Sequence, residues 1–415
     1  MTKIILSFLI FAIVAWGNAK RKHSWLTSSS FLICLYTVSV LMTIVDIPLN
    51  DDNLVLSDKY WGASSFMVVM ILAFLYPMLH FDESKIQRLK LPSRKLLDAF
   101  SNVIIVLSLF SIFYYIPTVW NIMHGDLGAL RNALYAGEEY VEASLLNTIA
   151  STSSSMYVFA LLLFFIYLIL GASKWRIILL FVSSLSNVVH VLAYVGRDGV
   201  VFWIFAFLYL YLFFSPFLRK VSKAKIKKIA IISGVILLVP FMLISIGRFQ
   251  DNTGTLNSIV SYFGQPFVYG TLYFGIDNPP LDPGHSFPLL FEFTGMKMPE
   301  GAGQWEEGGT VSWVFGTFLK SLYASLGGAI PLIIFCLISG LIFVTVFGKK
   351  RTTFLFSSVF IYILYFEVYS QGVFYFRQYT RGGNLFILLC FLMALIFNVL
   401  QNSGKPIVIE RIRGG

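Results

Sequence analysis

The chain has 415 residues and a formal net charge of +10. Of its residues, 57% are hydrophobic and only 13% charged, and its mean hydropathy is +0.77. A soluble protein of this length would need more polar residues to cover its surface, so the composition excludes the soluble globular class. The three cysteines lie in apolar runs without ligand spacing, which excludes a disulfide framework and a zinc site.

Apolar runs of about 20 residues, the length that crosses a bilayer, recur along the whole chain. We predict eleven spans, at about 4–19, 26–45, 60–80, 97–119, 146–170, 177–194, 199–217, 229–247, 326–347, 353–370 and 385–400. In the first of them the positive charges follow the apolar run, which favours a span over a cleaved signal peptide. The predicted fold is an all-α, polytopic transmembrane helical bundle, with 1–415 as a single membrane domain.

The charges of the connecting segments predict the topology. If the basic segments are placed in the cytoplasm, 22 of the 31 lysines and arginines lie inside, and 16 of the 21 acidic residues lie outside. This asymmetry follows the positive-inside rule, so we expect an external N-terminus and a cytoplasmic C-terminus. The net charge is then a topology signal, and it indicates no nucleic-acid partner.

Residues 248–325, between the eighth and ninth predicted spans, form the longest segment without a span. Their richness in glycine, proline and aromatic residues predicts a large external loop with short helices, of a length that is more often functional than connective. Residues 310–325 have the pattern of an interfacial amphipathic helix that leads into the ninth span.

Four arginines lie at the external ends of predicted spans, where the charge asymmetry predicts few basic residues: Arg197, Arg248, Arg377 and Arg381. Charge near the hydrocarbon is costly and tends to be functional, and a guanidinium matches the oxygens of a phosphate. We interpret the set as a shared site for a pyrophosphate, although each arginine alone could also pair with a nearby acid. Beside Arg197, Asp198 is its expected orienting partner, and Gly196 and Gly199 would let the backbone approach the phosphate closely.

A phosphate ligand at the outer face of a membrane indicates a lipid-linked sugar. No phosphate-binding loop or dinucleotide-binding pattern is present in the sequence, so we expect no nucleotide. Such chemistry also needs a base near the attacking hydroxyl. We consider three catalytic candidates, each with an ordinary structural role as its alternative: Glu367 inside the tenth predicted span, and His285 and Glu292 in the long loop.

The chain resembles the Wzy-type O-antigen polymerases, a family of polymerases of oligosaccharide repeat units. The resemblance rests on the span layout, the Gly-Arg-Asp-Gly turn at 196–199, the late external loop, and the pattern of 309–343, in which a loop helix is followed by a Gly-Gly break into a span. Many relatives carry an acidic residue before this break, where this chain has Ala324, Ser325 and Leu326.

This resemblance implies a GT-C-like, metal-independent glycosyltransferase without a soluble cofactor, in the bacterial inner membrane. It would transfer the growing glycan from undecaprenyl pyrophosphate to a new lipid-linked repeat unit at the periplasmic face. Its implied partners are undecaprenyl-pyrophosphate-linked oligosaccharides, membrane lipid and a chain-length regulator. Two alternatives remain at this point: an O-antigen ligase that acts on the lipid A core, and a flippase for lipid-linked oligosaccharides.

Overall fold

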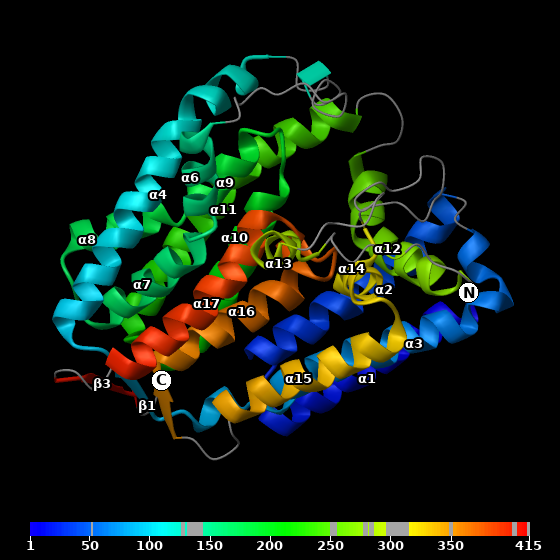
Figure 1. Cartoon of the computed structure of the whole chain (residues 1–415), viewed down its shortest axis with the longest axis horizontal. Coiled ribbons are helices and arrows are strands. Elements are labelled where there is room, and N and C mark those ends of the chain that lie inside the picture. The colour runs from blue at the N-terminus through cyan, green and yellow to red at the C-terminus, as the bar shows by residue number, and fades with distance from the viewer. Residues whose placement is uncertain are drawn as a thin grey trace. The chain divides into compact units, whose positions relative to one another are not determined.

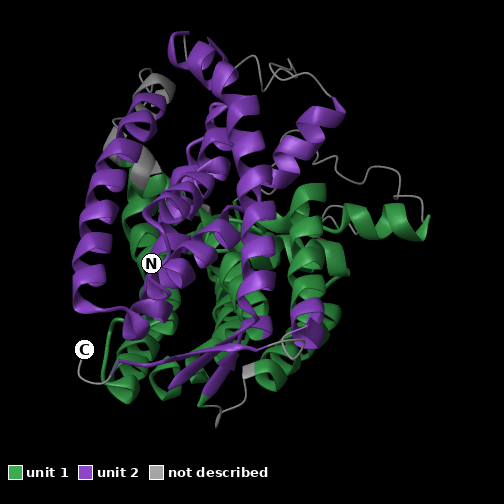
Figure 2. Cartoon of the chain, turned by 90° about the vertical axis from the view of Figure 1, so that its left-hand side faces the viewer, with its two compact units in different colours: residues 1–86, 256–352, 358–394 green, residues 87–255, 353–357, 395–415 purple. Residues whose placement is uncertain are grey.

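The computed structural model describes residues 1–50, 53–125, 129–130, 144–249, 255–276, 281, 286–295, 315–347, 352–400 and 405–412. Nearly all regular structure in these residues is helical, which confirms the predicted all-α class (Figure 1). The chain divides into two compact units, each assembled from separate stretches of sequence (Figure 2). Unit 1 comprises 1–86, 256–352 and 358–394, and unit 2 comprises 87–255, 353–357 and 395–415.

Most helices of the described chain are membrane-spanning in length and composition. Nine are long and apolar enough to cross a bilayer, or ten if the pair α6 and α7, bent by 44°, forms one span. The protein is therefore a membrane protein, since such helices satisfy all their backbone hydrogen bonds internally. A helix lies at each of the eleven predicted positions, but the one at 353–370 has only 16 residues.

Unit 1 is built mainly from helices at the two ends of the chain and from the segment that was expected to be a loop. Its elements are α1 (Thr2–Lys22), α2 (Ser28–Asn50), η1 (Asn53–Leu56), η2 (Asp58–Tyr60), α3 (Trp61–His80), η3 (Glu83–Lys85), α12 (Thr255–Phe274), α13 (Pro288–Thr294), α14 (Thr317–Leu326), α15 (Ala329–Phe347), and most of α16 (Phe356–Gln371) and α17 (Arg381–Leu400), with η5 (Arg377–Tyr379) between them.

Helix α16 is the core of this unit, because every one of its residues except Val368 is buried. Apolar side chains predominate along it, as is typical of a helix surrounded by protein. Helix α15 instead turns a stripe of apolar side chains outward: Ile330, Leu337 and Leu341 are 73%, 63% and 65% exposed. Exposed apolar stripes of this kind face the hydrocarbon in a membrane protein.

The segment 248–325 differs from the expected loop. Its helix α12 has 20 residues, longer than the short helices we expected, and packs against α2 and α3. Glycines make this close packing possible: a Cβ at Gly264 would lie 2.7 Å from the Cβ of Asp46, and one at Gly270 would lie 2.8 Å from the Cε of Met67. Helix α14 is buried on nearly all sides, and residues 310–314 of the predicted interfacial helix lie outside the described residues.

Unit 2 holds the helices of the middle of the chain and a small sheet. Its elements are β1 (Arg88–Leu91), α4 (Arg94–Met123), α6 (Leu145–Ser154), α7 (Tyr157–Ile169), α8 (Lys174–Ser183), α9 (Ser186–Leu192), α10 (Asp198–Phe214), η4 (Ser215–Phe217), α11 (Lys220–Phe249), β2 (Thr353–Leu355) and β3 (Ile407–Glu410). Strand β1 pairs in parallel with β2 and antiparallel with β3, so the sheet joins three segments that are distant in sequence.

Candidate functional site

A continuous chain of polar side chains runs through unit 1, where α13, α14, α16 and α17 meet. It begins at Glu367, which is only 3% exposed and accepts a hydrogen bond from Nε2 of Gln371, one helical turn further along α16. The Nε2 of Gln378, in η5, donates to Oε1 of Gln371 at 3.1 Å. A buried carboxylate is costly without hydrogen bonds, and these amides stabilise Glu367.

The chain continues from η5 into α17, α13 and α14. The Nδ2 of Asn384 donates both to the carbonyl oxygen of Gln378, at 2.6 Å, and to the carbonyl oxygen of Ser286, at 2.9 Å. The hydroxyl of Ser325 donates to the hydroxyl of Ser286 at 2.7 Å, and Ser286 Oγ donates to the carbonyl oxygen of Ser321 at 3.2 Å. Asn384 thus ties the start of α13 to η5 and α17.

Glycines and backbone pairing bring these elements together. A Cβ at Gly383 would lie 2.5 Å from the Cα of Gln378, so only glycine lets η5 fold onto the first turn of α17. The amide N–H of Phe318 donates to the carbonyl oxygen of Gly372 at 2.8 Å, and that of Thr317 donates to the carbonyl oxygen of Phe374 at 3.1 Å. These bonds hold the start of α14 to the segment that follows α16.

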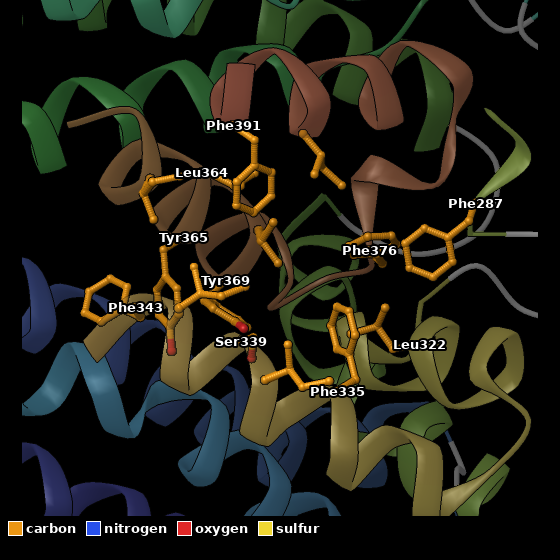
Figure 3. A pocket seen from close by; sticks show the side chains of 15 residues that line it. Phe287, Leu322, Phe335, Ser339, Phe343, Leu364, Tyr365, Tyr369, Phe376 and Phe391 are labelled. Atoms are coloured by element: carbon orange, nitrogen blue, oxygen red, sulfur yellow. The ribbon is translucent and has the colours of Figure 1, made fainter. Parts of the chain in front are cut away.

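An apolar cavity of about 330 Å³ lies between α15, α16 and α17, within unit 1 (Figure 3). Its lining is almost entirely aliphatic and aromatic: Phe287, Leu322, Phe335, Ile338, Ser339, Ile342, Phe343, Ile361, Leu364, Tyr365, Val368, Tyr369, Phe376, Ile387 and Phe391. Ile338, Ile342 and Phe391 are also 51%, 37% and 36% exposed, so the cavity opens onto the apolar outer surface of the helices. A cavity of this size and lining suits a segment of an apolar chain.

One end of this cavity lies beside the polar chain. Phe287 and Phe376 face one another at that end, with ring centroids 6.0 Å apart (Figure 3). Phe287 directly follows Ser286, and Phe376 directly precedes Arg377. The cavity wall at this end is therefore continuous in sequence with the polar chain, at Ser286, and with Arg377. Glu367 itself does not line the cavity.

Arg377, Arg381 and Glu292 lie in this part of unit 1. Arg377 is half-buried in η5. Arg381, the first residue of α17, has a side chain that is 75% exposed, and its Nε lies 2.6 Å from Oε1 of Glu292 in α13. The Glu292 side chain is 42% exposed and therefore accessible to a ligand. The structure thus brings two of the predicted arginines and one predicted acid to neighbouring elements.

Arg197 and Asp198 lie in unit 2, at the start of α10. Arg197 is buried, with 6% exposure, and its guanidinium carbon lies 5.8 Å from the centroid of the Phe241 ring. A Cβ at Gly196 would lie 2.6 Å from Cγ1 of Val191, and one at Gly199 would lie 2.8 Å from the Cβ of Val191. The two glycines therefore allow α9 to pack closely against α10. We had expected them to let the backbone approach a phosphate, but the contacts seen here are with Val191.

Two of the predicted site residues lie partly or wholly outside the residues that the structure describes. Arg248 lies in the last turn of α11, but its side chain is outside the described residues, and His285 lies wholly outside them. In the part of the chain that the structure describes, no group of three or more His, Cys, Asp or Glu side chains could hold a metal ion.

The sequence interpretation missed several residues of this region. Gln371, Gln378, Asn384 and Ser286 are ordinary polar residues, and only their long-range contacts reveal them as one chain. A further residue, Lys320 in α14, is 1% exposed and its Nζ lies 5.4 Å from the centroid of the Tyr273 ring. Burial lowers the pKa of Lys320 to about 7. In the sequence, Lys320 could have been noticed as a lysine within the largely apolar stretch of 309–343.

Comparisons of the chain with protein-family models, with curated proteins and with solved structures found no match.

Proposed function

We propose that the protein is a glycosyltransferase that polymerises lipid-linked oligosaccharide repeat units at the outer face of a bacterial inner membrane. The observation that carries this proposal is the position of the apolar cavity, open to the membrane, beside the polar chain and Arg377. Such a site can hold a lipid tail in the cavity and the charged head of the same molecule next to it. The resemblance to the Wzy-type polymerases supports the same reaction.

In the proposed reaction, the bond between the anomeric carbon and the lipid pyrophosphate breaks as an acceptor hydroxyl oxygen bonds to that carbon. The lipid pyrophosphate leaves with the bonding electrons, and the hydroxyl proton passes to a base. We assign Arg377 and Arg381 the role of stabilising the charge on the departing pyrophosphate, because the donors of a guanidinium match phosphate oxygens. No nucleotide takes part.

For the base, we favour Glu292 among the sequence-predicted candidates. Its accessibility and its ion pair with Arg381 place a carboxylate beside a proposed pyrophosphate ligand. Glu367 is buried, bonded to Gln371 and absent from the cavity wall, so we assign it the role of positioning Gln371 and Gln378. A base must reach the hydroxyl that it deprotonates. The exposed Glu292 meets this requirement, and the buried Glu367 does not.

The proposal is tested by deleting the gene and separating the lipid-linked glycans of the surface by size. We expect single repeat units in place of a polymer ladder, and complementation with the wild-type gene should restore the ladder. An unchanged ladder in the deletion strain would contradict the proposal. Loss of all surface glycan, with polymer accumulating on the carrier lipid, would instead indicate a ligase.

A further inference from the structure

A second charged cluster lies in unit 2 and is centred on Asp98 of α4. The Nε of Arg94 lies 3.3 Å from Oδ2 of Asp98. Arg176 of α8 pairs with Oδ1 of the same carboxylate, and the hydroxyl of Tyr167 of α7 donates to it as well. We call Arg94, Asp98, Tyr167 and Arg176 the Asp98 cluster. Three neighbouring helices thus converge on one carboxylate.

The tyrosine ring orders both arginines. The guanidinium carbon of Arg94 lies 4.9 Å from the centroid of the Tyr167 ring, and that of Arg176 lies 5.1 Å from it. Arg176 also donates through Nη2 to Oδ1 of Asn102. Two guanidinium groups are therefore held in place by cation–π contacts and hydrogen bonds before any ligand arrives.

The cluster carries more positive charge than a structural ion pair requires. Two guanidinium groups face one carboxylate, and the neighbours Lys95 and Lys174 are exposed. The side chains of Arg94 and Arg176 are 45% and 23% exposed, so solvent or a ligand can reach both. Such an excess of ordered, accessible cations favours an anion as a further partner.

The surroundings identify the kind of anion. Trp175, between Lys174 and Arg176, is 76% exposed. Exposed tryptophan beside lysine and arginine is typical of the interface between hydrocarbon and headgroups. The segments 81–95 and 174–176 belong to the basic set expected in the cytoplasm, and basic sites between spanning helices on that side bind anionic lipid headgroups.

We propose that the Asp98 cluster binds the phosphodiester of an anionic phospholipid headgroup at the cytoplasmic surface of the bilayer. Arg94 and Arg176 contact the phosphate oxygens, Lys95 and Lys174 add positive potential, and Trp175 lies at the level of the headgroup. The site is independent of the proposed glycosyl transfer, since it involves none of its residues.

The test uses the full-length protein in nanodiscs and the quenching of Trp175 by brominated lipid. The Trp175 contribution is the difference in quenching between the wild type and Trp175→Phe. We expect brominated phosphatidylglycerol to quench this contribution more strongly than brominated phosphatidylcholine at equal mole fraction. Arg94→Gln should weaken the preference about five-fold, the effect of one cation near an anionic surface, whereas Arg219→Gln, an exposed arginine outside the cluster, should leave it unchanged.

Three results would overturn the proposal. Equal quenching by both lipids in the wild type would show that no anionic headgroup is held there. An equal response of Arg94→Gln and the wild type would leave the cluster as a structural ion-pair network. Loss of the preference on addition of inorganic phosphate, but not of sodium chloride at the same ionic strength, would show that the site takes free phosphate. If Arg94→Gln does not fold, Lys174→Gln, whose side chain is exposed, serves as the second variant.

Discussion

Two turns of the molecule combine arginine with glycine just before an apolar helix: 196–199 before α10, in unit 2, and 377–383 before α17, in unit 1. In sequence they are alike. In the structure, Arg197 of the first turn is buried against the Phe241 ring. The side chain of Val191 occupies the space beside Gly196 and Gly199. The second turn keeps Arg377 half-buried and Arg381 exposed, next to residues of an apolar cavity.

The two turns differ in how far their arginines are exposed. What separates the two turns is access: a guanidinium can bind a pyrophosphate only if the ligand reaches its donors. The turn at 377–383 has this access and a neighbouring place for a lipid tail. The turn at 196–199 has the properties of a packing contact between helices.

The largest expected effect is that of Arg377→Ala. Because it removes a donor from the proposed pyrophosphate site, polymer formation should fall about 100-fold or more, with the amount of folded protein unchanged. Arg377→Lys should restore only part of the activity, since an ammonium lacks the two-pronged geometry of a guanidinium. Polymer yield is measured from the glycan ladder of complemented deletion cells, and folded protein by size-exclusion chromatography.

Arg197→Ala is the matched variant for the other turn. We expect it to lower the free energy of unfolding by about 2 kcal/mol, since it removes a buried and packed side chain. The activity per folded molecule should remain near that of the wild type. An Arg197→Ala variant that folds normally but makes no polymer would contradict the packing role of Arg197. It would support the sequence prediction that Arg197 binds pyrophosphate.

Filling the cavity should give the next largest effect. Ser339→Phe places a ring among the lining residues of α15, where a lipid tail would lie, and we expect polymer formation to fall about 10-fold, roughly 1.4 kcal/mol of lost binding. Leu337→Phe is the control: it lies two residues earlier on the same helix, is 63% exposed and does not line the cavity. Equal activity of both variants would remove the cavity from the proposed site.

The packing role of the first turn can be tested by Gly199→Ala. Its Cβ would lie 2.8 Å from the Cβ of Val191, so α9 and α10 must separate, at a cost of about 1–3 kcal/mol. Thermal unfolding in detergent, followed by tryptophan fluorescence, measures the loss. Adding Val191→Gly removes the opposing Cβ and should restore part of the stability, measured against Val191→Gly alone. A double variant as unstable as Gly199→Ala alone would show that the glycine is needed for another reason.

The sequence could predict the helices but only part of the site. Runs of about 20 apolar residues mark their spans by composition alone, which is why each predicted span contains a helix. The burial of α12 was hidden because Gly264 and Gly270, which allow its close packing, are also typical of loops. The contact of Asn384 with Ser286 joins residues 98 positions apart, and no local pattern encodes such a pairing.

The sheet of unit 2 was missed for a similar reason. Its strands have only three or four residues, and each gains its hydrogen bonds from segments far away in the chain, such as Arg88 opposite Glu410. Short strands without a neighbouring partner in sequence carry too weak a pattern to be recognised. By contrast, Arg377 and Arg381 could be named as candidates from the sequence, because charge at the end of an apolar run stands out locally.

A further prediction concerns Lys320 and the pH dependence of stability. Burial lowers the pKa of this lysine from its ordinary value of 10.5 to about 7 in the folded protein. Between these two values the unfolded chain binds more protons than the folded protein, so this group makes stability rise with pH across that window. Below pH 7 the lysine is protonated in both states, and its burial cost is present in full.

Lys320→Met removes the titrating group and keeps a side chain of similar length. The difference in free energy of unfolding between wild type and Lys320→Met should therefore shift in favour of the wild type from pH 7 to pH 9, by at most about 1.4 kcal/mol per pH unit. Melting temperatures of both proteins in the same detergent, at pH 6, 7, 8 and 9, give the comparison. A difference that stays constant over this range would mean that Lys320 keeps its proton in the folded protein. Its Nζ, near the Tyr273 ring, would then be a fixed cation within unit 1.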